Sequence, residues 1–331
     1  MRILVMGAGA LGSVAGGFMA RAGHEVCLVG RAPHVRCISE QGLSIEGIWG
    51  RHQTGPLAAC TRVEELTQRE FDLILVAVKS YDTHEAARQI APLVSPDTWV
   101  CSYQNGLGNT EAIAQEVGWE HVLGARVIFG ARIIEPGRVE VTVIAAPTAI
   151  GGYGGDAAEK AARKTAAAMD EALLPTQFTN CIRTVLWSKV AYNCALNPLS
   201  ALLNVPYGAL AEIGHTRGIM NDVVHELYRV AAAMEIPLAP ATAGEYLDAF
   251  YTQLLPPTAA HYASMREDLV QGRRTEVDAL NGAIARFGKD KQIACPINAM
   301  LTGLVHAREC LGRRDQRPHA SCPIGKMKWS P

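Results

Sequence analysis

The stretch that decides the fold lies near the start of the chain and reads Arg2-Ile3-Leu4-Val5-Met6-Gly7-Ala8-Gly9-Ala10-Leu11-Gly12. The apolar residues 3–6 predict a buried strand, and the run after the glycines predicts a helix that ends at Gly23. A GxGxxG pattern alone is a weak signal, but strand, glycines and helix in this order are typical of a dinucleotide-binding turn. The glycines let the backbone approach a pyrophosphate, and the helix N-terminus directs N–H groups at it. An ordinary Gly-rich turn is the alternative. The expected cofactor ligands are Gly7, Ala8, Gly9, Ala10, Leu11 and Gly12.

The end of the second predicted strand bears on the choice between NAD and NADP. In NAD-binding turns an acidic residue at this point hydrogen-bonds the ribose 2′-hydroxyl. Here the sequence reads Val29-Gly30-Arg31, with Arg36 shortly after. An arginine can bind a 2′-phosphate through two parallel hydrogen bonds, although a solvated surface arginine is the alternative. The sequence therefore favours NADP(H), with Arg31 as a ligand.

The order of periodic segments predicts the fold class. The N-terminal half alternates β-rich runs with longer helical patterns, which is typical of parallel βαβ units. The expected strands are 3–6, 25–29, 72–78, 98–102, 122–129, 138–143 and 148–151, followed by an exposed helix over 157–174. From residue 184 onward the patterns are helical, over 184–205, 207–235, 243–252, 264–288 and 296–311. We therefore predict an α/β protein with three parts: a Rossmann-type, parallel-sheet NADP-binding domain (1–181), an all-α substrate and catalytic domain (182–312) and a tail (313–331).

Composition limits the partners and the compartment. The 331 residues include 31 Lys plus Arg and 32 Asp plus Glu, so no overall charge attracts the chain to nucleic acid or to an anionic membrane. Nine cysteines occur without a CxxC pair or a Cys/His ligand spacing, which predicts no metal site and favours a reducing cytoplasm. Residues 3–20 carry no charge and could pass for a signal peptide, but their glycines fit the nucleotide turn. Residues 190–210 contain asparagines and prolines that lipid would not tolerate. The sequence leaves a homodimer open.

Polar residues follow two neighbouring strands at the predicted carboxyl edge of the sheet. Lys79 comes directly after the apolar run 73–78, and Asn105-Gly106 follows the next strand. Ligands bind at this edge in doubly wound sheets. Taken singly, a surface lysine and a simple Asn-Gly turn are the alternatives, but together the two residues favour a binding role.

A polar stripe marks the first helix of the second domain. Lys189, Asn193 and Asn197 recur every four residues and so share one face of a helix whose other residues are apolar. Buried polar groups need partners, so the stripe is either a set of structural cross-links or part of a site. We favour a site, because an ammonium can stabilise negative charge on a carbonyl oxygen and donate a proton to it.

Two further positions are candidates in the second domain. Ser264 opens a predicted helix, where Ser264 and Glu267 have the spacing of a capping box, and a helix N-terminus with a serine hydroxyl is also a carboxylate site. Glu276 is expected on a helix face with Leu280 and Ala283, an unusual place for a solvated carboxylate. An ion pair with Arg273 is the alternative for Glu276.

Over about residues 1–310 the chain resembles the ketopantoate reductase (2-dehydropantoate 2-reductase) family. The shared segments occur in family order: GAGALG, Val78-Lys79-Ser80, residues 104–108, the Lys189 helix, and residues 264–268 with 273–282. The resemblance implies Lys189 as proton donor, Asn105 as a contact of cofactor and substrate, and Asn193, Asn197 and Ser264 as substrate ligands. It further implies that Gly7 to Gly12, Arg31, Lys79 and Glu276 hold NADP, with the backbone of Ala131 near the nicotinamide. The implied reaction is the NADPH-dependent reduction of ketopantoate to (R)-pantoate, in pantothenate and coenzyme A biosynthesis.

Two departures concern the substrate pocket. Tyr207 and His261 stand where enterobacterial members have asparagines, so both are candidate substrate contacts that set this chain apart. A paralogous NADPH-dependent reductase of another small 2-keto acid therefore remains open. A non-catalytic NADP-binding sensor is a third hypothesis, which the retention of Lys189 argues against. Hydroxyisobutyrate-type dehydrogenases also have a lysine with an asparagine four residues on, but residues 264–282 do not fit them.

Overall fold

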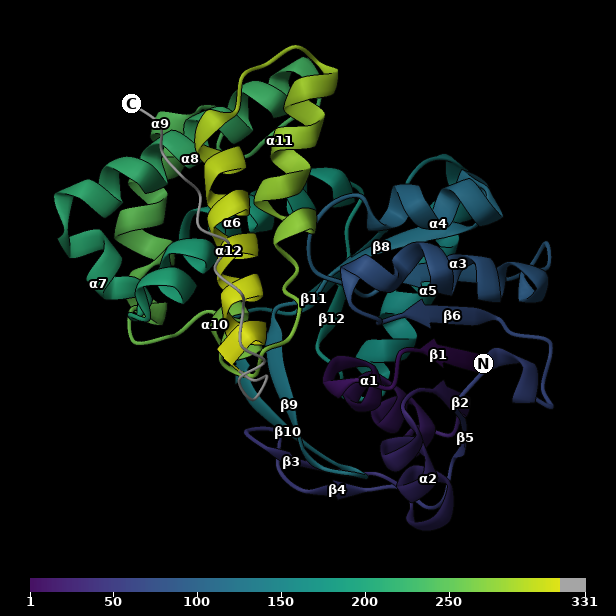
Figure 1. Ribbon diagram of the computed structural model, residues 1–331. Helices are drawn as coiled ribbons and strands as arrows, with labels where there is room; N and C mark the ends of the chain where they lie inside the picture. Colours follow the sequence, from purple (N-terminus) through teal and green to yellow (C-terminus); the bar gives the residue numbers. More distant parts are fainter. Residues whose placement is uncertain (316–331) are drawn as a thin grey trace, which may run out of the picture.

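The computed structural model describes residues 1–315, so most of the predicted tail lies outside the described residues. Its N-terminal part is built on an eight-stranded sheet in the order β12-β11-β8-β7-β6-β1-β2-β5 (Figure 1). All neighbouring strands pair in parallel except β11 and β8, which are antiparallel to each other. The strands are β1 (Arg2–Met6), β2 (Glu25–Val29), β5 (Ala58–Cys60), β6 (Leu73–Val76), β7 (Trp99–Ser102), β8 (Val122–Arg126), β11 (Thr148–Gly152) and β12 (Thr176–Phe178). All four residues of β6 are buried, as expected where helices cover both faces of a parallel sheet.

A second sheet of four strands lies beside helix α1, in the order β4-β3-β10-β9. Its strands are β3 (Ser44–Gly47), β4 (His52–Gln53), β9 (Phe129–Glu135) and β10 (Arg138–Ile144). The single strand predicted over 122–129 is therefore wrong: the chain leaves the first sheet after Arg126 and enters the second at Phe129. Val127 and Ile128, at the corner, are apolar and β-branched, so the sequence pattern runs through it without a break.

Five helices belong to the N-terminal part. They are α1 (Ala10–Arg21), α2 (Ala32–Gln41), α3 (Thr83–Ile90), α4 (Asn109–Val117) and α5 (Gly155–Glu171). Helices α3 and α4 pack against each other over one face of the large sheet, and α1 and α5 pack over the other. The carboxyl ends of the parallel strands are thus left facing the C-terminal helices (Figure 1).

The C-terminal part is helical. Its helices are α6 (Ile182–Leu203), α7 (Tyr207–Glu212), α8 (Gly214–Ala233), α9 (Ala243–Ala249), α10 (Ser264–Val270), α11 (Asn281–Asp290) and α12 (Pro296–Asp315). Helix α6 packs against α8, α10 and α12, and it also contacts β8 and β11 of the sheet. The predicted fold class is confirmed: an α/β parallel-sheet domain is followed by a helical domain that begins with α6.

Three helices predicted from periodicity are interrupted. The segment 207–235 is split at Ile213, which is extended, and the segment 243–252 ends as an α-helix at Ala249 and continues in a π-turn. The segment 264–288 is broken after α10, where Gly272 has a φ of 64°. Apolar spacing continues across these breaks because residues on both sides face the same core, so periodicity alone does not reveal them.

Candidate active site

The turn after β1 has the geometry that a phosphate-binding turn needs. Gly7 has a φ of 114°, and a Cβ atom there would lie 2.5 Å from the backbone nitrogen of Val78. At Gly12 a Cβ would lie 2.2 Å from the carbonyl oxygen of Gly7, so neither position accepts a side chain. Helix α1 begins at Ala10, and its N-cap residue, Gly9, makes no side-chain cap. The predicted strand, turn and helix are therefore present, with the helix start available to an anion.

Arg31 lies where the second strand leads into helix α2. It is the exposed N-cap residue of that helix and, among the described residues, forms no ion pair. Arg36 is exposed on the same helix. Both guanidinium groups are thus free to bind a phosphate beside the glycine turn.

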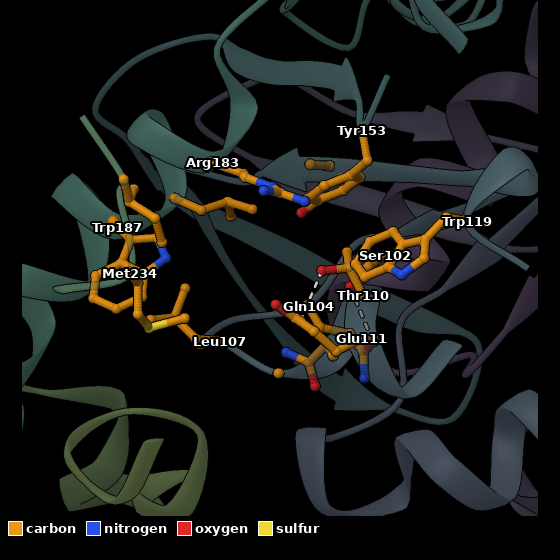
Figure 2. Close-up of a pocket in the computed structure, with 17 residues that line it drawn as sticks. Ser102, Gln104, Leu107, Thr110, Glu111, Trp119, Tyr153, Arg183, Trp187 and Met234 are labelled. Atoms are coloured by element: carbon orange, nitrogen blue, oxygen red, sulfur yellow. Dashed lines mark hydrogen bonds between the residues drawn. The ribbon is translucent and has the colours of Figure 1, made fainter. Parts of the chain in front are cut away.

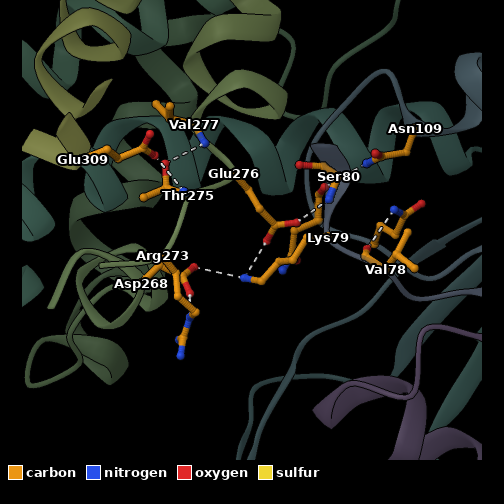
Figure 3. Close-up of polar contacts among 12 residues, drawn as sticks. Val78, Lys79, Ser80, Asn109, Asp268, Arg273, Thr275, Glu276, Val277 and Glu309 are labelled. Carbon is orange, nitrogen blue, oxygen red and sulfur yellow. Dashed lines mark hydrogen bonds and ion pairs between the residues drawn. The ribbon is translucent and has the colours of Figure 1, made fainter. Parts of the chain in front are cut away.

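Lys79 links the two domains through an ion cluster (Figure 3). Its ammonium donates to Oδ2 of Asp268 at 3.0 Å and lies 3.5 Å from Oε2 of Glu276. The backbone N–H of Ser80 donates to the other oxygen of Glu276 at 3.0 Å. Burial alone would lower the pKa of Lys79, but the carboxylates of Glu276 and Asp268 outweigh it and raise this pKa. The cluster fixes the carboxyl end of β6 against the helical domain.

The placement of Glu276 corrects an expectation. It does not share a helix face with Leu280 and Ala283, because it precedes a short 3-10 turn, Val277–Ala279, that separates α10 from α11. The alternative of a pair with Arg273 is also wrong: the Nε of Arg273 donates to Asp268 at 2.8 Å. Sequence reasoning assigned no role to Asp268. The available signal was its position three residues after Met265 and next to Leu269, the two apolar residues that are buried with it in α10.

Lys189 and Asn105 meet at the carboxyl edge of the sheet. The ammonium of Lys189 donates to Oδ1 of Asn105 at 2.6 Å and to the carbonyl oxygen of Val127 at 2.5 Å. Asn105 is not part of a free turn, because a Cβ at Gly106 would lie 2.5 Å from the carbonyl oxygen of Ala279 in the helical domain. Burial, and after it the nearby charge of Arg126, lowers the pKa of Lys189 to about 8, while Glu276 opposes part of this shift. Perturbed groups of this kind are typical of catalytic acids and bases.

The two asparagines of helix α6 differ in their surroundings. Asn197 is buried, and its Oδ1 accepts a hydrogen bond of 2.7 Å from the hydroxyl of Tyr207, which is also buried. Burial raises the pKa of the Tyr207 phenol. Asn193 is only partly buried, and its side chain has no hydrogen-bond partner among the described residues. Asn197 thus has the internal partner that a structural role requires, whereas Asn193 is free to bind a ligand.

Ser264 and His261 lie at the start of helix α10. The predicted capping box at Ser264 is wrong: Ala263 is the N-cap residue, and the helix starts with Ser264 itself, so its hydroxyl caps nothing. The helical domain has such a box at Thr242, whose Oγ1 accepts from the N–H of Glu245 at 3.2 Å. Ser264 and His261 are both exposed, and the His261 ring lies 5.5 Å from that of Tyr207. Burial lowers the pKa of His261.

The remaining candidate, Ala131, lies in β9 of the second sheet, opposite Val141. It is partly exposed and belongs to the strand that begins just after the Val127 corner. Ala131 therefore lies four residues after Val127, whose carbonyl oxygen accepts a hydrogen bond from Lys189. None of the contacts described above includes it.

A cavity of about 220 Å³ lies beside the segment that follows Asn105 (Figure 2). It is lined by Gly106 to Thr110 and by side chains that include Trp119, Tyr153, Arg183 and Trp187. The Arg183 guanidinium lies 5.3 Å from the centre of the Tyr153 ring. None of the predicted site residues lines this cavity, so the candidate site lies at the carboxyl edge of the sheet, around Lys189 and the glycine turn.

Residues 1–315 show neither a metal-ligand cluster nor a membrane-spanning helix. The described side chains include no group of three His, Cys, Asp or Glu residues arranged to hold a metal ion. No described helix combines the length and apolar character needed to cross a membrane. The eight cysteines in this part of the chain are all free thiols.

Comparisons with known proteins cover nearly the whole chain. The family model "Ketopantoate reductase PanE/ApbA" matches residues 3–155, and its C-terminal counterpart matches residues 181–309. The 2-dehydropantoate 2-reductase of Aquifex aeolicus is 40% identical over 95% of this chain and 99% of its own length. The Pyrococcus abyssi enzyme of the same name is 36% identical, over 94% and 99%.

Solved structures give two further likenesses. A ketopantoate reductase from Ralstonia eutropha is 31% identical with a TM-score of 0.82, covering 95% of this chain and 100% of that one. D-mandelate dehydrogenase, in a ternary structure with NADH and anilino(oxo)acetate, is 30% identical with a TM-score of 0.85, over 95% and 100%.

Proposed function

Because the chain belongs to the ketopantoate reductase family, we propose that it is a 2-dehydropantoate 2-reductase that converts ketopantoate into (R)-pantoate with NADPH. The observation that carries the proposal is the Lys189 ammonium, held by Asn105 and Val127 where the carboxyl ends of two strands meet the helical domain. We further propose a division into residues 1–181, 182–312 and 313–331. A cytoplasmic location is proposed as well, which the free cysteines support.

The residues around the glycine turn fit a dinucleotide. Gly7 and Gly12 leave no room for a Cβ, and α1 starts without a side-chain cap, which suits a pyrophosphate. Arg31, which forms no ion pair within residues 1–315, suits a 2′-phosphate. NADPH, when bound, would supply the hydride. In our proposal Gly7 to Gly12, Arg31, Lys79, Asn105 and Glu276 hold it, with the Ala131 backbone nearby.

Lys189 has the position and charge of a proton donor. As a ketone becomes an alcohol its oxygen gains negative charge, which an ammonium in a low-dielectric cleft stabilises and then neutralises by giving up a proton. Asn105 fixes the direction of the ammonium through a 2.6 Å hydrogen bond. Asn193 and Ser264, whose side chains have no hydrogen-bond partner among the described residues, are the proposed direct substrate ligands. Asn197, Tyr207 and His261 are the proposed lining of the substrate pocket.

A second candidate is the reduction of a bulkier, more apolar 2-keto acid. The likeness to D-mandelate dehydrogenase favours it, together with the Tyr207 phenol that bonds to Asn197. The hydroxyl of Tyr207 is engaged internally, so the distal hydroxyl of ketopantoate has one polar partner fewer than an asparagine would offer. The two candidates share the Lys189 chemistry and differ only in substrate.

NADPH oxidation against a panel of 2-keto acids tests the proposal. Ketopantoate, its analogue without the distal hydroxyl, and phenylglyoxylate should be compared by kcat/KM. Highest kcat/KM with ketopantoate supports the first candidate, and highest with phenylglyoxylate supports the second. No turnover of any 2-keto acid would contradict both.

We expect NADPH to be used at least tenfold better than NADH. Charge-assisted hydrogen bonds contribute about 1.5–3 kcal/mol each, so losing those from Arg31 to a 2′-phosphate should cost about a factor of ten or more. Arg31→Ala should reduce this preference, whereas Arg69→Ala, at an exposed site remote from the turn, should not. Dissociation constants of both cofactors measure the effect. Equal affinity of the unaltered protein for NADH and NADPH would contradict the prediction.

The pH dependence of kcat/KM should follow the protonation state of Lys189. A donor must be protonated in the free enzyme, and the pKa of Lys189 is lowered to about 8. We therefore expect kcat/KM for the keto acid to be constant below pH 8 and to fall roughly tenfold per pH unit well above it. Steady-state rates in overlapping buffers from pH 6 to 10 measure this. A kcat/KM that stays constant up to pH 10 would show that Lys189 is not the acid.

A further inference from the structure

Arg126 lies beside Lys189 and was not singled out by any sequence motif. The next residue, Val127, gives its carbonyl oxygen to the Lys189 ammonium at 2.5 Å. Gly124, two residues before Arg126, lies on the same face of β8. This face is turned towards helix α6, because a Cβ at Gly124 would lie 3.1 Å from the side chain of Ile182. Lys189 is seven residues after Ile182 and therefore lies on the same face of α6, two turns further on. The side chains of Arg126 and Lys189 thus share the space between β8 and α6.

The charge of Arg126 is not balanced by the part of the chain that the structure describes. One terminal nitrogen donates to the carbonyl oxygen of Pro147 at 3.1 Å. Its Nε is buried and has no partner, and among the described side chains it forms no ion pair. Burial lowers the pKa of Arg126. A half-buried guanidinium that has no ion pair among the described residues, beside an ammonium, offers a site for an anion.

We propose that Arg126 binds the carboxylate of the 2-keto acid while Lys189 holds the adjacent carbonyl oxygen, an assignment that rests on the proposed function. In a 2-keto acid the two groups are on neighbouring carbons, so two neighbouring cations match them. The guanidinium fork fits a carboxylate through two hydrogen bonds, and an amide or ester offers it no charge. Arg126 therefore selects free acids, and Ser264 adds a neutral hydrogen bond.

The bound carboxylate also acts on Lys189. In the free protein Arg126 contributes to the lowered pKa of Lys189. A carboxylate on the guanidinium cancels part of that effect, so the ammonium keeps its proton in the complex. The alkaline limb of the kcat profile should then lie at higher pH than that of kcat/KM.

Binding of oxamate, a 2-oxo carboxylate that is not readily reduced, tests Arg126 without turnover. Calorimetry with the NADPH-loaded protein should give at least tenfold weaker oxamate binding for Arg126→Met, since a hydrogen bond to a charged group contributes about 1.5–3 kcal/mol. Arg126→Lys keeps the charge but loses the guanidinium fork, so its affinity for oxamate should lie between those of the unaltered protein and Arg126→Met. Arg132→Met is the matched control, because that exposed arginine pairs with Glu140 in the second sheet. Oxamide, the neutral analogue, should bind all four proteins equally weakly.

The outcomes separate this proposal from the proposed function. Unchanged oxamate affinity in a folded Arg126→Met protein, or no oxamate binding by the unaltered one, overturns the role of Arg126 whatever the enzyme reduces. Oxamate binding that depends on Arg126, in a protein that reduces no 2-keto acid, supports the anion site and overturns the reductase. A thermal melt of each variant shows whether it is folded.

Discussion

Replacing Lys189 with alanine is expected to lower kcat by roughly 10²–10⁴ while NADPH still binds, as for the removal of a general acid. The ammonium is held by Asn105 and Val127, and after its removal those acceptors can bind water but no proton donor faces the substrate carbonyl. Stopped-flow measurement of hydride transfer, with fluorescence titration of NADPH, separates chemistry from binding.

Lys289→Ala is the matched control, because Lys289 is exposed at the end of α11. Its kcat should equal that of the unaltered protein. If Lys189→Ala also retains its kcat, the proton comes from another group and the proposed mechanism is wrong.

Replacing Glu226 with alanine is expected to lower the free energy of unfolding by roughly 3 kcal/mol, the scale found when a buried charged partner is removed. Glu226 on α8 is buried, and its carboxylate accepts from the N–H groups of Ile297 and Asn298 at 2.9 Å. It also accepts from the Asn298 side chain at 2.7 Å. These are the first N–H groups of α12, so the substitution leaves buried donors without partners at a helix start.

Denaturant unfolding monitored by circular dichroism measures this loss. Glu226→Gln keeps one carbonyl acceptor, so its free energy of unfolding should fall by less than that of Glu226→Ala. Asp222→Ala, one turn earlier on α8 and exposed, should change the free energy of unfolding by under about 0.5 kcal/mol. A Glu226→Ala protein as stable as the Asp222→Ala protein would show that water replaces the carboxylate.

Local patterns were sufficient to predict much of the fold and part of the site. The glycine turn was predictable because strand, turn and helix are set within a short stretch, and the structure has it at Gly7 to Gly12. Lys189 and Asn105, which only the family resemblance brought together, are joined by a hydrogen bond of 2.6 Å. The glycine turn rests on a rule of local geometry, whereas the contact between Lys189 and Asn105 joins residues 84 apart in the sequence.

Contacts between distant segments were not predictable from one sequence. Lys79 and Asp268 are 189 residues apart, and no spacing rule pairs them. Tyr207 and Asn197 come together only because the chain turns between α6 and α7. Arg126 occupies the last position of a strand that the sequence pattern extended too far, so its place near Lys189 was not predictable.

The Lys79 cluster limits how freely the two halves of the chain can be exchanged. A chimera joined before α6 would take Lys79 from one parent and Asp268 and Glu276 from the other. Where the first parent lacks the lysine, the buried carboxylate of Asp268 would keep only Arg273, and the halves would lose their charged link. The two domains are separate in architecture, but a chimera keeps this charged link only if both sides of the cluster are transferred together.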